Sequence, residues 1–243
     1  RARRGMVTSP HHLASEAGLR VLREGGNAIE AAVAIAANLA VVYPHMTSIG
    51  GDGFWLIAPP GKDPIAIDAC GAAALTAEPA LYAKAGHKTI PWRGPLAANT
   101  VAGTISGWGS ALALAQDHGG RMPLARLLED AAWHGENGFA VTHSQHALTA
   151  EKLPELKDAP GFKDQFLSKG KPPAEASLMK LPALARTLKR LGRDGAQDFY
   201  TGKIARDLAA GLAEIGAPVT ADDLARHRAT RPEPLSVAIK GAK

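Results

Sequence analysis

The sequence has one cysteine, few aromatic residues and no long hydrophobic run. Aromatic residues make up 5% of the 243 positions. A lone cysteine forms no internal disulfide, so it gives no evidence for or against an oxidising compartment. The longest apolar run, residues 31–43, is interrupted by Asn38 and falls short of the roughly 18 residues that a membrane span requires. We therefore expect this run to form a buried helix.

The chain also lacks a concentration of charge of one sign. It has 28 Lys and Arg against 23 Asp and Glu, a net charge of +5, and its basic residues are spread along the sequence. This distribution argues against a nucleic-acid-binding stripe. With 46% hydrophobic residues, we expect residues 1–243 to belong to one globular domain with a sizeable core. The compartment stays open, with the cytoplasm slightly favoured over the periplasm.

The hydrophobic pattern predicts mostly helices. A helix over residues 10–24 ends at two glycines, and Asn27 stands where an N-cap belongs before a central helix over 28–43. Two apolar runs, 54–58 and 65–67, flank turn residues and predict a β-hairpin apolar enough to be covered on both faces. Further helices are predicted over 106–118, 124–135, 144–152, 182–191, 204–215 and 221–227, and one more strand over 235–239. Because so few strands make a poor sheet, we expect another polypeptide or a further part of the chain to complete it.

No complete catalytic motif is found in the sequence. A serine hydrolase elbow needs Gly-x-Ser-x-Gly, but residues 103–107 read Gly-Thr-Ile-Ser-Gly, with the first glycine one residue too early. The glycine-rich residues 50–53 lack the Lys-Ser/Thr of a phosphate-binding loop and precede a strand. We interpret them as a tight turn that leads into a buried strand. Either the chain is not an enzyme, or its chemistry comes from elsewhere.

The histidines and the cysteine do not assemble a site by spacing alone. His143 and His146 could share one helical face, yet no third ligand stands at a recognisable spacing, so no metal site is predicted. We interpret these two as surface residues, and likewise His11, His12 and His45, although His45 precedes the glycine-rich turn and could approach a pocket. A single cysteine such as Cys70, without an assignable base, is more often a small buried residue than a nucleophile.

Several motifs, taken in order, resemble the larger part of the gamma-glutamyltransferases. The two specific elements are Gly-Gly-Asn-Ala-x-x-Ala-Ala at residues 25–32 and Gly-Gly-x-Gly-Phe at 50–54. The resemblance covers residues 5–238. The other matching stretches are residues 5–7, 12–18, 22–24, 33–34, 66–68, 103–107, 121–124, 198–205 and 223–225.

This resemblance implies an α+β fold, the αββα sandwich of N-terminal-nucleophile hydrolases. Members are made as a precursor that cleaves itself into a large and a small subunit, which would account for the missing strands. The small subunit begins with the Thr that attacks the amide carbonyl, and its α-amino group, with an intrinsic pKa of roughly 7.7 to 8.0, serves as the base. The resemblance thus implies a small-subunit partner, no catalytic residue in this chain and no metal or organic cofactor.

The sequence departs from the family at Cys70. Where typical members read Asp-Phe-Arg-Glu, residues 68–71 read Asp-Ala-Cys-Gly. In gamma-glutamyltransferases that Arg holds the α-carboxylate of the glutamyl group, and losing one partner of such a pair leaves a charge unpaired. We therefore expect Cys70 to line the pocket and the substrate to be another amide, small or differently charged. Relatives that cleave cephalosporin side chains or oxamate show such drift, and Arg93 or His45 could supply a replacement cation.

Two alternatives remain open. A true gamma-glutamyltransferase or glutathione hydrolase would require a substitute anchor for the carboxylate. A non-catalytic relative would act as a scaffold or binding protein. These alternatives are separated by whether the gene continues into a Thr followed by a strand-rich small subunit.

Overall fold

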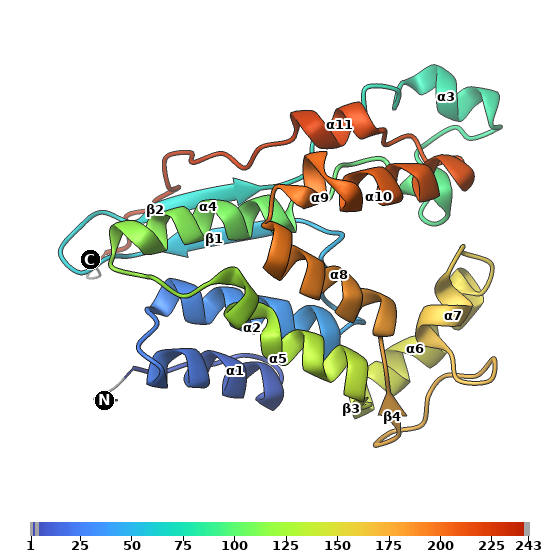
Figure 1. Ribbon diagram of the computed structural model, residues 1–243. Coiled ribbons are helices and arrows are strands. Elements are labelled where there is room, and N and C mark those ends of the chain that lie inside the picture. Colours follow the sequence, from blue (N-terminus) through green and yellow to red (C-terminus); the bar gives the residue numbers. More distant parts are fainter. Residues whose placement is uncertain (1, 3–4, 241–243) are drawn as a thin grey trace.

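The computed structural model describes residue 2 and residues 5–240, and most of the regular structure is helical (Figure 1). The strands are β1 (Gly53–Ile57), β2 (Ile65–Ala69), β3 (Phe139–Ala140) and β4 (Leu178–Met179). The helices are α1 (His12–Arg23), α2 (Ala28–Val42), α3 (Pro79–Lys84), α4 (Thr104–Asp117), α5 (Leu124–Asn137), α6 (His143–Leu156), α7 (Phe162–Phe166), α8 (Pro182–Asp194), α9 (Asp198–Thr201), α10 (Lys203–Glu214) and α11 (Ala221–Arg226), with a short 3₁₀ turn at Pro95–Ala97.

Helix α2 is central, as its all-round apolar sequence predicts. It packs against α1, α4 and α5, and both Val33 and Val41 are fully buried. Its start is fixed by a capping box: Asn27 accepts from the backbone N–H of Ile29 and Glu30, and Glu30 accepts from that of Asn27. The predicted N-cap is confirmed, and α2 becomes the support against which the neighbouring helices and the hairpin are placed.

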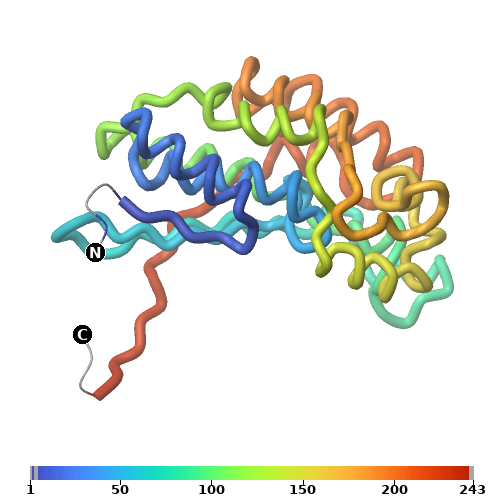
Figure 2. Tube along the Cα trace, turned by 90° about the horizontal axis from the view of Figure 1, so that it is seen from below, coloured from blue at the N-terminus to red at the C-terminus, as the bar shows by residue number. Residues whose placement is uncertain are grey.

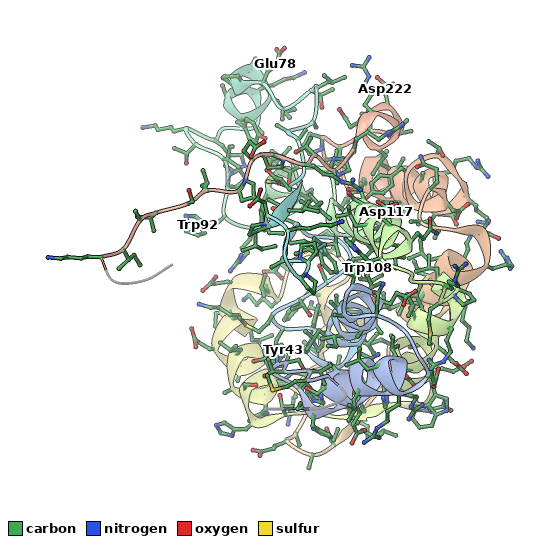
Figure 3. All side chains as sticks on the ribbon, turned by 90° about the vertical axis from the view of Figure 1, so that its left-hand side faces the viewer. Tyr43, Glu78, Trp92, Trp108, Asp117 and Asp222 are labelled. Atoms are coloured by element: carbon green, nitrogen blue, oxygen red, sulfur yellow. The ribbon has the colours of Figure 1, made fainter. Side chains whose placement is uncertain are left out.

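The predicted hairpin is formed by β1 and β2, which pair antiparallel with Trp55 opposite Ile67. Its inner face packs on α4, where Trp108 is buried and lies within the body of the molecule (Figure 3). On the outer face Phe54 is 69% and Leu56 71% exposed. The expectation that both faces are covered is therefore not met within residues 5–240, where one face of the hairpin has nothing packed on it.

The strand predicted over residues 235–239 is wrong. Thr230 makes an antiparallel bridge to Asp68 of β2, but the chain beyond it leaves the body of the molecule (Figure 2). Leu235, Val237 and Ile239 are all exposed, and residues 231–239 have no regular structure. A strand needs a neighbour for its backbone N–H and C=O groups, and the described part of the chain offers none here.

The surface position predicted for His11 is also wrong, because His11 is 5% exposed. Its Nδ1 caps α1 by accepting from the N–H of Leu13 at 3.2 Å, and its ring stacks on His12 at a centroid distance of 4.8 Å. Among the described residues, no helix combines the length and apolarity that crossing a bilayer demands.

Candidate substrate-binding site around Cys70

Cys70 directly follows β2, and the last two residues of that strand together with the next two, residues 68–71, are here called the Cys70 turn. Its backbone N–H donates to Oδ1 of Asp68 at 2.8 Å. The Asp68 backbone in turn exchanges two hydrogen bonds with Thr230, at 2.9 and 2.8 Å. Asp68 is thus a strand-end residue whose carboxylate accepts from a backbone N–H, and its pairing with Thr230 fixes one side of the turn to the chain after α11.

Asp52 of the glycine-rich turn faces Cys70. Its Oδ1 accepts the N–H of Gly71 at 2.8 Å, and its Oδ2 lies 3.6 Å from Sγ of Cys70. The negative charge of Asp52, together with some desolvation and the hydrogen bond, raises the pKa of the Cys70 thiol. Cys70 is exposed. The residue at this position is therefore a neutral, hydrogen-bonded thiol beside a carboxylate, not a cation.

The other side of the turn is held by close backbone packing. A Cβ on Gly71 would stand 1.6 Å from the carbonyl oxygen of Val101, and one on Gly103 would stand 1.8 Å from that of Ala69. Both glycines are required sterically, since the opposing atoms belong to the main chain. Gly103 thus allows the start of α4 to pack against the Cys70 turn.

Thr104 and Ser106 connect this region to its surroundings. Oγ1 of Thr104 donates to the carbonyl oxygen of Gly51 at 2.8 Å, which holds the glycine-rich turn against α4. Oγ of Ser106 lies 2.8 Å from the carbonyl oxygen of Gly103 and 2.8 Å from Nε2 of His227. Ser106 is not a nucleophile in this arrangement, because its hydroxyl hydrogen is directed to a backbone carbonyl.

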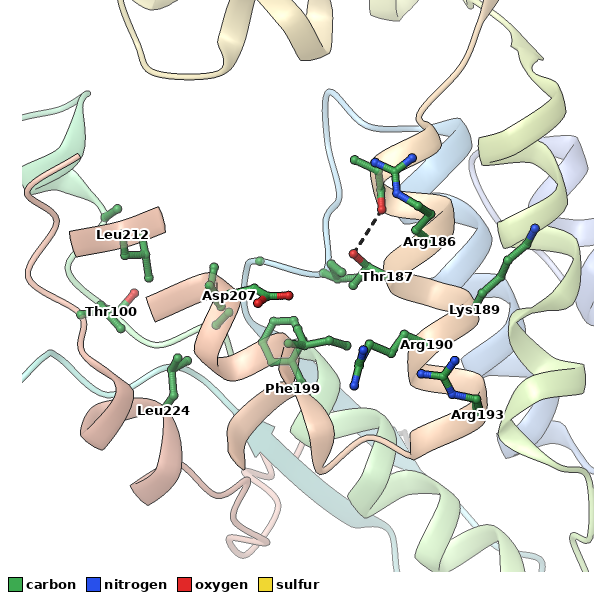
Figure 4. Close-up of a pocket in the computed structure, with 18 of the residues that line it drawn as sticks. Thr100, Arg186, Thr187, Lys189, Arg190, Arg193, Phe199, Asp207, Leu212 and Leu224 are labelled. Atoms are coloured by element: carbon green, nitrogen blue, oxygen red, sulfur yellow. Dashed lines mark hydrogen bonds between the residues drawn. The ribbon is translucent and has the colours of Figure 1, made fainter. Parts of the chain in front are cut away.

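Two cavities border the glycine-rich turn. One of about 940 Å³ lies between α8 and the chain over α9 and α10, and Gly50 is part of its lining. Figure 4 shows Arg186, Thr187 and Arg190 on one side of it and Phe199 and Asp207 on the other. A smaller cavity of about 410 Å³ is lined by residues that include His45, Asp52, Thr104 and Trp108. The smaller cavity is the one that adjoins the Cys70 turn, because Asp52 both lines this cavity and contacts Cys70.

Neither replacement cation predicted from the sequence contacts the Cys70 turn in the described residues. Arg93 pairs with Glu155 of α6 at 3.2 Å, and both side chains are exposed. His45 does line the smaller cavity, but its Nε2 lies 3.2 Å from Oγ of Ser144, and burial lowers its pKa. His45 is therefore a neutral imidazole near the site.

The remaining histidines named from the sequence lie elsewhere. His143 is exposed, with its Nδ1 3.0 Å from Oε2 of Glu175. His146 lies one turn further along α6, and its Nδ1 lies 2.9 Å from the carbonyl oxygen of Pro173. Across residues 5–240, His, Cys, Asp and Glu side chains form no group of three that could hold a metal ion.

The site contains residues that sequence reasoning missed. Asp52 stands out in the sequence only as part of a turn, although a carboxylate within a glycine-rich turn is a signal that could prompt a search for its partner. Ser106 and His227 meet across 121 positions of sequence, and no spacing rule connects them.

Comparison with known proteins places these observations in a family. The model for gamma-glutamyltranspeptidase matches residues 14–243. The oxamate amidohydrolase proenzyme of Klebsiella pneumoniae is 55% identical over 234 residues, which cover 96% of this chain and 44% of that protein. The glutathione hydrolase-like YwrD proenzyme of Bacillus subtilis is 37% identical over 237 residues, which cover 97% of this chain and 44% of that protein. The chain thus spans less than half the length of these relatives.

Solved structures agree with the sequence comparison. The structure of Helicobacter pylori gamma-glutamyltranspeptidase matches with a TM-score of 0.90 at 32% identity, covering 100% of this chain and 69% of that one. The cephalosporin acylase from Bacillus halodurans matches with a TM-score of 0.87 at 28% identity, covering 99% of this chain and 46% of that one. Both matches extend over nearly all of the chain.

Proposed function

Since the chain belongs to the gamma-glutamyltranspeptidase family and has the N-terminal-nucleophile hydrolase fold, we propose that it forms the larger part of a self-processed amide hydrolase. The α+β class predicted from the sequence is confirmed by the solved relatives. The attacking group is the N-terminal Thr of a small subunit cut from the same precursor, and its α-amino group is the base. The proenzyme names of the relatives support this proposal.

The outer face of the β1–β2 hairpin is the surface on which that small subunit packs. Phe54 and Leu56 are exposed there in antiparallel register with Asp68 and Ala66. A two-stranded sheet with an uncovered apolar face gains stability when a second sheet packs on it. The small subunit also lies where it can present its N-terminal Thr to the Cys70 turn, because that turn includes the end of β2. In this assembly residues 1–243 are part of one domain.

The substrate is a small amide that does not carry the α-carboxylate of a γ-glutamyl group at this position. The observation that supports this is the Cys70–Asp52 pair, a neutral thiol 3.6 Å from a carboxylate. An anionic group placed here would meet the negative charge of Asp52 without a compensating cation. Oxamate, named for the 55% identical relative, is a candidate of suitable size. Its own carboxylate would then be bound by a cation outside the Cys70 turn.

This proposal is tested on the complete precursor. Intact mass and N-terminal sequencing should show a second, smaller chain that begins with Thr, and replacing that Thr with Ala should abolish both processing and amidase activity. The processed enzyme should prefer oxamate over glutathione by roughly 100-fold or more in kcat/KM, as expected when a charged partner is missing. A single uncleaved chain, inactive on every amide tested, would support the scaffold role instead.

A substitution at Cys70 tests whether this residue is the reason that the enzyme prefers a small amide over glutathione. Cys70→Arg should increase kcat/KM for glutathione because it restores the guanidinium that pairs with the α-carboxylate. Cys70→Ser, which is small and neutral, should bring no such gain. Efficient glutathione hydrolysis by the unmodified enzyme would contradict the substrate assignment and favour a glutathione hydrolase, the name of relatives at 30 to 34% identity.

A further inference from the structure

His227 follows α11 directly and is buried, with 6% of its surface exposed. Its ring packs against Tyr200 at a centroid distance of 5.3 Å, and its Nε2 lies 2.8 Å from Oγ of Ser106. The charged groups that face it are Arg228 on its own segment and Asp52 in the glycine-rich turn. Burial is the largest influence and lowers the pKa of His227, so the ring is neutral at neutral pH.

The hydrogen-bond network assigns the tautomer of this neutral ring. Ser106 Oγ lies 2.8 Å from the carbonyl oxygen of Gly103, which can only accept, so the hydroxyl hydrogen is used there. We therefore assign the ring hydrogen to Nε2 of His227, which donates it to Oγ of Ser106. Directly beside it, the hydroxyl of Tyr200 accepts the N–H of Ser106 at 2.8 Å and donates to the carbonyl oxygen of Ala102 at 2.9 Å.

Two paths lead from His227 to the Cys70 turn. The first passes through Ser106 to Gly103, which lies so close to the backbone of Ala69 that a Cβ on this glycine would stand 1.8 Å from the Ala69 carbonyl oxygen. The second runs along the chain to Thr230, which pairs with Asp68, and Asp68 accepts the N–H of Cys70. A shift of His227 would therefore reach Asp68 and Ala69, the two residues that directly precede Cys70.

We propose that His227 is a positioning residue: by donating from Nε2 to Ser106, it holds the Cys70 turn in its substrate-binding position. Its ring contacts Ser106 and Tyr200, and in the described residues no hydrogen bond joins it to Cys70. The kinetic consequence rests on the proposed amide hydrolysis, whereas the effect on the geometry of the turn does not.

The test compares two amides of different length at position 227 in the complete, processed protein. The side-chain nitrogen of His227→Gln reaches the place of Nε2 and can donate to Ser106, whereas that of His227→Asn reaches only the place of Nδ1. His143→Asn, at an exposed histidine, is the matched control. The rate at which iodoacetamide alkylates the thiol of Cys70, followed by peptide mass spectrometry, reports the state of the turn without any need for activity.

Loss of one hydrogen bond should change the alkylation rate of Cys70 and the KM for the amide roughly three- to tenfold. His227→Asn should increase the alkylation rate by that factor and raise KM for the amide by a similar factor, with kcat changed less than about twofold. His227→Gln should stay near the unmodified protein in both. Ser106→Ala, which removes the acceptor at little change in volume, should reproduce the effect of His227→Asn and provides the test if the latter does not fold.

Unchanged alkylation in His227→Asn and Ser106→Ala would overturn the proposal, as would equal effects of Gln and Asn at position 227, which would mean that only ring packing matters. A protein inactive on every amide, but with the predicted alkylation pattern, would contradict the proposed function and leave the positioning role supported.

Discussion

Two glycines place main chain against main chain beside Cys70, and this gives a prediction for the residue scale. Gly71→Ala should lower the free energy of unfolding by about 2 kcal/mol or more, because its Cβ would overlap the carbonyl oxygen of Val101, at 1.6 Å. Gly50→Ala is the control, since a Cβ there would meet nothing nearer than Oγ of Ser48 at 3.8 Å. Urea unfolding measures both, and equal effects would contradict the steric argument.

The burial of His11 predicts an acid-sensitive stability. Desolvation, followed by the nearby His12, His134 and His45, lowers the pKa of His11 from 6.5 to about 4. Between these values the unfolded chain binds a proton that the folded chain does not, so the free energy of unfolding should fall as the pH drops from 6.5 to 4, by roughly 3 kcal/mol.

His11→Asn isolates this contribution. The Asn side-chain oxygen can replace Nδ1 as the acceptor for the N–H of Leu13, but it does not titrate. Urea unfolding at several pH values between 4 and 6.5 should therefore show a shallower decline for the variant than for the unmodified chain. His143→Asn, at an exposed position, should leave the slope unchanged. Parallel curves for His11→Asn and the unmodified chain would show that His11 is not the group responsible.

At this scale the sequence identifies Cys70 but not its surroundings. Cys70 stands out because its aligned position differs from the family pattern, which is information that a sequence carries. The carboxylate of Asp52 and the imidazole of His227 belong to the site only because folding brings them close to Cys70 and to Ser106, which lie far away in the sequence. Hydrogen bonds between residues far apart in the chain leave no periodic trace.

On the element scale, the start of α2 depends on a buried carboxylate. Glu30 is 2% exposed, and its two oxygens accept the N–H of Asn27 and of Met122, each at 2.7 Å. One side chain therefore closes the capping box of α2 and ties that helix to the segment before α5. No cation pairs with Glu30 within the described residues, so the buried carboxylate is stabilised by these two N–H donors.

Glu30→Gln should destabilise the chain by about 2 kcal/mol, because one of the two buried N–H groups would face the NH₂ group of the new amide instead of an oxygen. Glu78→Gln is the comparison: Glu78 also lies at the start of a helix, as the N-cap of α3, but it is exposed and its side chain makes no capping hydrogen bond. It should change stability by less than about 0.5 kcal/mol. Thermal unfolding followed by circular dichroism distinguishes them, and similar losses for both would disprove the role of Glu30.

Elements with strong periodicity or clear caps are predicted well. The glycine stop before Asn27 and the apolar stripe of α5 locate helices α1, α2 and α5 to within a few residues. The strands β3 and β4 have two residues each, too short for any alternation to be recognised. Residues 235–239 alternate as a strand should, but a pattern does not specify a neighbour, and the described chain provides none.

For the whole molecule, the apolar residues without partners are the informative ones. Phe54 and Leu56 lie exposed on the hairpin, and Leu235, Val237 and Ile239 lie exposed on the extended segment after Thr230. The other large apolar residues of the hairpin, Trp55, Ile57, Ile65 and Ile67, pack in or against the core. Large exposed side chains gathered on one sheet face indicate an interaction surface, and in the proposed assembly they meet the small subunit.

This assembly gives a prediction for the complete precursor. Phe54→Glu should weaken the pairing of the processed large and small subunits by roughly ten- to 100-fold, because burying a Phe side chain contributes about 1.5–3 kcal/mol. Trp133→Glu is the control, since Trp133 is also exposed but lies on α5, which packs against α2 and α8 away from the hairpin (Figure 1). Dissociation in increasing urea, followed by native mass spectrometry, measures the pairing of both variants. If Phe54→Glu paired as tightly as the unmodified protein while Trp133→Glu dissociated, the small subunit would have to pack on the α5 side, and its Thr would lie far from the Cys70 turn.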